Sequence, residues 1–152
     1  VSDNVDNVLR LERLIAAPPE HVFELWTEPE QMVKWWGPEG YDIPVHALDV
    51  RPGGRWRTTM RHASGRELTV SGMYRNIEPP RRLVFTWGWE DEKGVRGHET
   101  EVTVTFEATP GGTRLVLLQQ TFETKESRDR HSHGWSSTFN KLAKAAGELQ
   151  RK

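Results

Sequence analysis

Histidine is the side chain in this sequence that could most readily move a proton, because its ordinary pKa lies near neutral pH. His62 and His98 fall on faces expected to point inward, and His133 stands near the start of a C-terminal helical pattern. The same inward faces carry three further hydrogen-bonding side chains, namely Thr58, Thr100 and Gln119. Together these groups could anchor a ligand's carboxylate or hydroxyl at one end of a pocket. The alternative is that His62 and His98 lie at strand ends in water.

Nucleophilic and metal chemistry find little support in the sequence. The absence of cysteine excludes thiol catalysis, cysteine-ligated zinc and disulfides. There is no Gly-x-Ser-x-Gly motif, and Ser136 and Ser137 have no base at a defined spacing. His131 and His133 could join a third histidine around zinc or copper, but the polar stretch around them is typical of a solvated loop or helix start. We therefore expect no catalytic residue, no metal and no cofactor.

Charge and hydropathy exclude two further classes of function. The 21 basic and 22 acidic residues are interspersed and give a net charge of -1, whereas nucleic-acid binders usually carry a basic stripe. No apolar run approaches the roughly 20 residues that span a bilayer, and the first residues are polar. We expect a soluble cytoplasmic protein that forms one domain over residues 1–152, binds no nucleic acid and has no membrane span. A homodimer is possible, but no feature demands it.

Two periodicities divide the chain into the elements that must position these groups. Alternation predicts a first strand over 8–16, and Pro18 and Pro19 then stop it and begin a short helix over 19–27. Thr27 and Glu30 have the spacing of a capping box, which predicts a second short helix over 27–36. Alternating segments joined by glycine- and proline-rich turns predict an antiparallel meander with strands over 41–50, 55–62, 66–77, 83–89, 100–106 and 113–120.

The C-terminal segment predicts the helix that covers the apolar face of this sheet. Its apolar residues recur at spacings of four, three, four and three, which makes one stripe on a helix. The stripe consists of Trp135, Phe139, Leu142, Ala146 and Leu149.

Five short phrases within this order sharpen the prediction. They are WWGP at 35–38, RPGGRW at 51–56, IEPPRRLVFTW at 77–87 after Gly72, GGTRL at 111–115 and HGW at 133–135. Together they resemble the activator of heat shock protein 90 ATPase homologue family, over about residues 8–149. This family lies within the START-like superfamily, which also holds polyketide cyclases and the birch-pollen allergen. The resemblance implies an α+β helix-grip fold, in which a curved antiparallel sheet of about seven strands wraps around a long C-terminal helix, with two short helices after the first strand.

The resemblance also implies an elongated apolar cavity between the sheet and the long helix. Seven tryptophans in a small chain need either a generous core or such a cavity. Inward positions supply the candidate ligand-binding residues, which are Trp56, Met60, Tyr74, Phe85, Trp87, Phe106, Leu117, Gln119, Trp135 and Phe139, with His62 and His98. The alternative is that these side chains meet and fill the interior.

The residues and the resemblance together leave three functions open. The leading hypothesis is a protein that binds a hydrophobic or amphipathic small molecule in the cavity. The second is a cyclase- or hydrolase-like enzyme, which a strongly shifted pKa at His98 or His62 beside the cavity would favour and an exposed position of both would oppose. The third is a co-chaperone-like interaction module of the stress response, with a filled interior and Trp35, Trp36 or Trp89 on the surface. Chaperone-activating relatives carry an extra N-terminal domain, and the few residues before the first expected strand leave no room for one.

Overall fold

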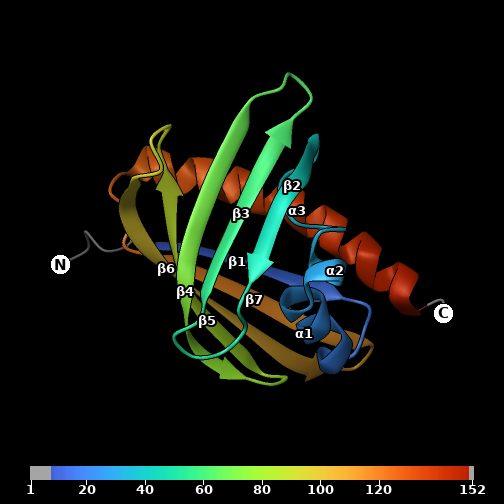
Figure 1. Cartoon of the computed structure of the whole chain (residues 1–152). Coiled ribbons are helices and arrows are strands. Elements are labelled where there is room, and N and C mark those ends of the chain that lie inside the picture. The colour runs from blue at the N-terminus through green and yellow to red at the C-terminus, as the bar shows by residue number, and fades with distance from the viewer. Residues whose placement is uncertain (1–7, 151–152) are drawn as a thin grey trace.

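A seven-stranded antiparallel sheet curls beside one long helix (Figure 1). The computed structural model describes residues 8–150, apart from the side chains of residues 148–150. In chain order the elements are β1 (Val8–Ile15), α1 (Pro19–Thr27), α2 (Pro29–Met32), β2 (Tyr41–Leu48), β3 (Arg55–His62), β4 (Glu67–Glu78), β5 (Arg82–Glu90), β6 (Arg96–Thr109), β7 (Gly112–Gln120) and α3 (Lys125–Gln150).

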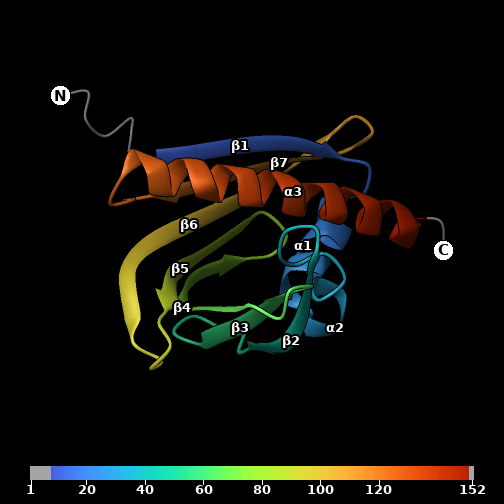
Figure 2. The same ribbon diagram turned by 90° about the horizontal axis from the view of Figure 1, so that it is seen from above.

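The strands follow the order β1-β7-β6-β5-β4-β3-β2, so the last six form a meander and β1 closes it by pairing with β7. Figure 2 shows β1 and β7 running along α3, while β6, β5 and β4 bend away from the helix toward β3 and β2. The α+β helix-grip fold predicted from the sequence is therefore confirmed. Among the helices of residues 8–150, none is long and apolar enough to cross a membrane.

Three interruptions of the strand register accompany this bend. They fall between Asp42 and Val45 in β2, between Tyr74 and Asn76 in β4, and between Gly88 and Glu90 in β5. An extra residue on one strand bends that strand and increases its local twist. The sheet can therefore turn away from the helix instead of lying flat against it.

The capping box predicted at Thr27 is wrong. The Thr27 hydroxyl donates to the carbonyl of Phe23 at 3.0 Å, on the last turn of α1, and no side chain caps α2. Pro29 begins α2 because its fixed φ suits the first helical position, and Glu28 before it is extended. The second helix consequently covers only Pro29–Met32, and a single tight turn leads from it to Trp36, whose N–H donates to the carbonyl of Met32.

The apolar stripe of α3 is buried as its spacing predicts. Trp135, Phe139, Leu142 and Ala146 are each at most 4 % exposed. Leu149, the last member of the predicted stripe, has a side chain outside the described part of the structure. Burial of a large apolar side chain is worth about 1.5–3 kcal/mol, so this stripe holds the helix across the sheet.

Candidate functional site

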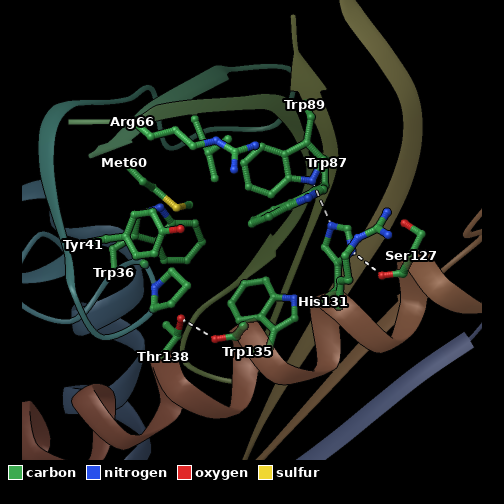
Figure 3. A pocket seen from close by; sticks show the side chains of 15 residues that line it. Trp36, Tyr41, Met60, Arg66, Trp87, Trp89, Ser127, His131, Trp135 and Thr138 are labelled. Carbon is green, nitrogen blue, oxygen red and sulfur yellow. Dashed lines mark hydrogen bonds between the residues drawn. The ribbon is translucent and has the colours of Figure 1, made fainter. Parts of the chain in front are cut away.

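A cavity of about 460 Å³ lies between the curled sheet and the first half of α3 (Figure 3). Its size is within the roughly 300–1,000 Å³ of small-molecule sites. Three parts of the chain line it. Strands of the sheet supply Tyr41, Met60, Leu68, Trp87 and Trp89, and the residue just before β4 supplies Arg66. The turn after α2 supplies Trp36, Gly37 and Pro38. The helix α3 supplies Ser127, Arg130, His131, Gly134, Trp135 and Thr138.

Four tryptophans line the cavity, namely Trp36, Trp87, Trp89 and Trp135. Trp87 lies at the centre, with its ring centroid 5.2 Å from that of Trp135, 5.6 Å from that of Trp89 and 5.9 Å from that of Trp36. Such separations are typical of favourable edge-to-face and offset ring pairs. The remaining three tryptophans join the same aromatic cluster, since Trp26, Trp35 and Trp56 all pack against Trp36. The cavity is therefore backed by a rigid aromatic cluster, in which Trp36, Trp87 and Trp135 are each at most 5 % exposed.

A buried chain of hydrogen bonds fixes the Trp135 wall. The Trp135 indole N–H donates to Gln119 Oε1 at 2.8 Å, and Gln119 Nε2 donates to Thr100 Oγ1 at 2.8 Å. The Thr100 hydroxyl donates in turn to the carbonyl of Trp87 at 3.4 Å. Gln119 is completely buried, so its amide groups are satisfied inside the protein. Its visible role is to orient Trp135 and to connect β6 and β7 with α3.

His131 is the histidine that lines the cavity. Its Nε2 accepts a hydrogen bond from the indole N–H of Trp89 at 2.9 Å, and its Nδ1 donates to the carbonyl of Ser127 at 2.7 Å. The indole can only donate and the carbonyl can only accept, so the ring is neutral with its proton on Nδ1. Burial lowers its pKa, and the nearby charge of Arg130 lowers it further, against the raising effect of the Ser127 carbonyl. With both ring nitrogens occupied, His131 locks Trp89 to α3.

Apart from the two histidines, the candidate residues from the sequence fall into three environments. Met60, Trp87 and Trp135 line the large cavity. Trp56, Tyr74 and Phe85 instead surround a separate void of about 10 Å³, too small for a ligand. The fully enclosed core takes Phe106, Leu117, Gln119 and Phe139.

The two histidines singled out in the sequence lie away from the cavity wall. His62 is exposed, with its Nδ1 hydrogen-bonded to the hydroxyl of Ser64. His98 is also exposed, and its Nε2 bonds the carbonyl of Thr121. Within the described residues, no group of three or more histidine, cysteine or carboxylate side chains could hold a metal ion.

Sequence reasoning missed the polar part of the site. His131 lies in the polar stretch that was expected to be solvated, and neither Arg66 nor Arg130 was among the candidate residues. A signal was nevertheless present on α3, where Ser127, His131, Gly134 and Thr138 recur at spacings of four, three and four. Ser127 and His131 continue the stripe of Trp135 toward the helix start, so the apolar stripe gives way to polar residues where α3 lines the cavity.

A second neutral histidine, His46, lies behind the Trp36 wall. The Thr58 hydroxyl donates to the carbonyl of Val45 at 3.1 Å, so its oxygen accepts the Nδ1 proton of His46 at 3.0 Å. The other ring nitrogen of His46, Nε2, is buried without a partner among the described residues. Burial lowers the pKa of His46 from 6.5 to about 4, because the charged ring would lose its hydration.

This shift predicts a loss of stability in acid. Above pH 6.5, His46 is neutral in both the folded and the unfolded chain. Below pH 6.5, His46 becomes protonated in the unfolded chain but stays neutral in the folded protein. The free energy of unfolding should therefore fall by about 2 kcal/mol between pH 7 and about pH 4, after a discount for partial exposure. Urea unfolding across this range measures it. His46→Gln should flatten the dependence and exposed His21→Gln should not; equal slopes in wild type and His46→Gln would contradict the assignment.

A curled sheet, a helix across it and a largely apolar cavity that opens to solvent define a ligand-binding or interaction module with a START-like, helix-grip fold. The comparison with protein families then gives the particular family. The model for the Activator of Hsp90 ATPase homolog 1-like protein family matches residues 16–147, and this chain belongs to that family.

Solved structures of similar proteins agree with this family assignment and with the fold. The AHSA1 protein of Silicibacter pomeroyi is 38% identical with a TM-score of 0.84, over 94% of this chain and 97% of that one. A protein of Chromobacterium violaceum is 27% identical with a TM-score of 0.84, over 92% and 96% of the two chains. An AHSA1-like protein of Aeromonas hydrophila, 20% identical with a TM-score of 0.76 over 95% of each chain, shares the fold. No curated protein matched the chain.

Proposed function

We propose that this protein binds an apolar or amphipathic small molecule in the cavity between its sheet and α3. The observation that carries the proposal is the cavity itself, about 460 Å³ in volume and walled by four tryptophans. Protein interiors are normally closely packed, and a cavity of this volume that stays empty loses dispersion contacts along its lining. A ligand would recover those contacts and remove the exposed apolar part of the lining from water, at about 25 cal/mol per Å² before the cost of ordering.

The enzyme hypothesis loses the feature that would have supported it. His62 and His98 are exposed and outside the cavity wall. His131 does line the cavity, but both of its ring nitrogens hold structural hydrogen bonds. A general base must reach the proton that it removes, and His131 would first have to release Trp89.

The interaction-module hypothesis is also less well supported than binding. It expected a filled interior and exposed tryptophans, whereas Trp35 and Trp36 are at most 1 % exposed and Trp89 is partly buried at the cavity. The exposed large apolar residues, such as Leu14, Val45 and Val95, come from separate strands and loops. Scattered single residues of this kind are normal on a protein surface.

Titration with the uncharged fluorescent probe N-phenylnaphthylamine tests the proposal. We expect saturable binding of one probe per chain, with quenching of tryptophan fluorescence because four indoles surround the site. Native mass spectrometry of the gently purified protein, before and after denaturation, would identify any small molecule that copurifies. Probe binding that does not saturate, or that leaves the tryptophan emission unchanged, would contradict the proposal.

A further inference from the structure

We propose that the cavity selects an anionic amphiphile, a flat apolar body bearing a carboxylate, whose charge is bound by Arg66 and Arg130. The inference rests on the proposed binding function and deepens it. Both arginines line the cavity, yet both are exposed, so they lie where the cavity meets solvent. A ligand with its rings against the tryptophans would place a terminal charged group at this opening.

The two side chains come from opposite walls. Arg66 directly precedes β4, and in Figure 3 its side chain extends across the top of the cavity toward Trp89. Arg130 belongs to α3 and lies near enough to His131 for its charge to act on that ring. Trp89 and His131, hydrogen-bonded to each other, connect the two walls. The two arginines therefore enter the cavity lining from walls that this hydrogen bond joins.

Neither arginine is neutralised within the protein. Elsewhere on the sheet, arginines pair with carboxylates, as Arg57 does with Glu90 at 3.0 Å and Arg61 with Asp42 at 2.7 Å. Within residues 8–150, Arg66 and Arg130 form no such ion pair, and no aspartate or glutamate lines the cavity. Two unpaired cations beside an apolar wall focus a positive potential on the opening.

Two other polar side chains of the lining, His131 and Thr138, are already engaged within the protein. His131 is neutral, and both of its ring nitrogens already hold hydrogen bonds. The Thr138 hydroxyl donates back to the carbonyl of Gly134 at 2.8 Å. Guanidinium groups match the geometry of a carboxylate with two parallel donors, and charge-assisted bonds of this kind are about twice as strong as neutral ones. The arginines are thus the groups that would distinguish an acid from its neutral analogue.

A matched pair of ligands tests the inference. Naphthoate and naphthalenemethanol share a flat ring system and differ in carrying a carboxylate or a hydroxyl, and each would be titrated by displacement of N-phenylnaphthylamine. We expect naphthoate to bind about tenfold more tightly, and Arg66→Gln with Arg130→Gln to remove most of this advantage. Arg55→Gln, a charge-removing change on the outer face of the sheet, should have no effect.

The outcomes separate this inference from the binding function. Raising the salt concentration from about 0.1 M to about 1 M should lower the affinity for naphthoate and leave the affinity for naphthalenemethanol unchanged. Equal affinities for both ligands, or a preference for naphthoate that survives the double arginine substitution, would overturn the anion site while leaving cavity binding intact. Failure of N-phenylnaphthylamine itself to bind would refute the proposed function.

Discussion

Leucine in place of Gly134 is expected to abolish N-phenylnaphthylamine binding while leaving the protein folded. Gly134 lies on α3 in the cavity wall, and a Cβ atom there would meet only Pro38 Cγ, at 3.8 Å. The new side chain therefore has space in the cavity but occupies the volume that a ligand needs. Removing glycine from a helix interior also adds up to about 1 kcal/mol of stability. We expect at least about a hundredfold loss of affinity, equivalent to about 2.7 kcal/mol.

Gly147 offers the matched control on the same helix. A Cβ atom at Gly147 would have no neighbour within 4 Å, and this glycine is outside the cavity lining. Gly147→Leu should gain the same helix propensity and bind the probe normally. Probe affinity that is unchanged in Gly134→Leu would show that the probe binds elsewhere, and a loss in both variants would point to a disturbed helix.

Alanine in place of Gly72 is expected to destabilise the fold by about 3 kcal/mol. A Cβ atom at Gly72 would lie 1.8 Å from the carbonyl oxygen of Thr86 and 2.6 Å from Trp56 Nε1. The Trp56 indole lies over this glycine of the neighbouring strand and donates to that same carbonyl at 3.1 Å. One methyl group would therefore force β4 and β5 apart and break a buried hydrogen bond, and overpacking alone costs about 1–3 kcal/mol.

Urea unfolding followed by circular dichroism measures this loss, with Gly97→Ala as its control. Gly97 is also a strand glycine, but it is exposed, and a Cβ atom there would meet only the Trp89 carbonyl at an ordinary 3.7 Å. We expect Gly97→Ala to change the free energy of unfolding by less than about 0.5 kcal/mol. An equally small change in the free energy of unfolding for Gly72→Ala would contradict the close contact of β4 and β5 at this position.

Local periodicity in the sequence determined the elements and their buried faces. The alternation over 55–62 placed Trp56, Thr58 and Met60 on the inward side of β3, and all three are at most 4 % exposed. The spacing of Trp135, Phe139 and Leu142 likewise identified the covered face of α3. These predictions succeeded because a strand or helix repeats its side-chain directions at a fixed period, whatever lies opposite.

Only the tertiary structure decided which inward residues meet one another and which face open space. Trp56 and Met60 share one face of β3, yet Trp56 borders a void of about 10 Å³ and Met60 the cavity of about 460 Å³. Exposed Arg66 and Arg130 likewise became lining residues because the sheet bends away from α3 and leaves open space beside the first half of that helix. That bend depends on register shifts and on packing between segments far apart in the chain, and the pattern within a single segment carries no information about either.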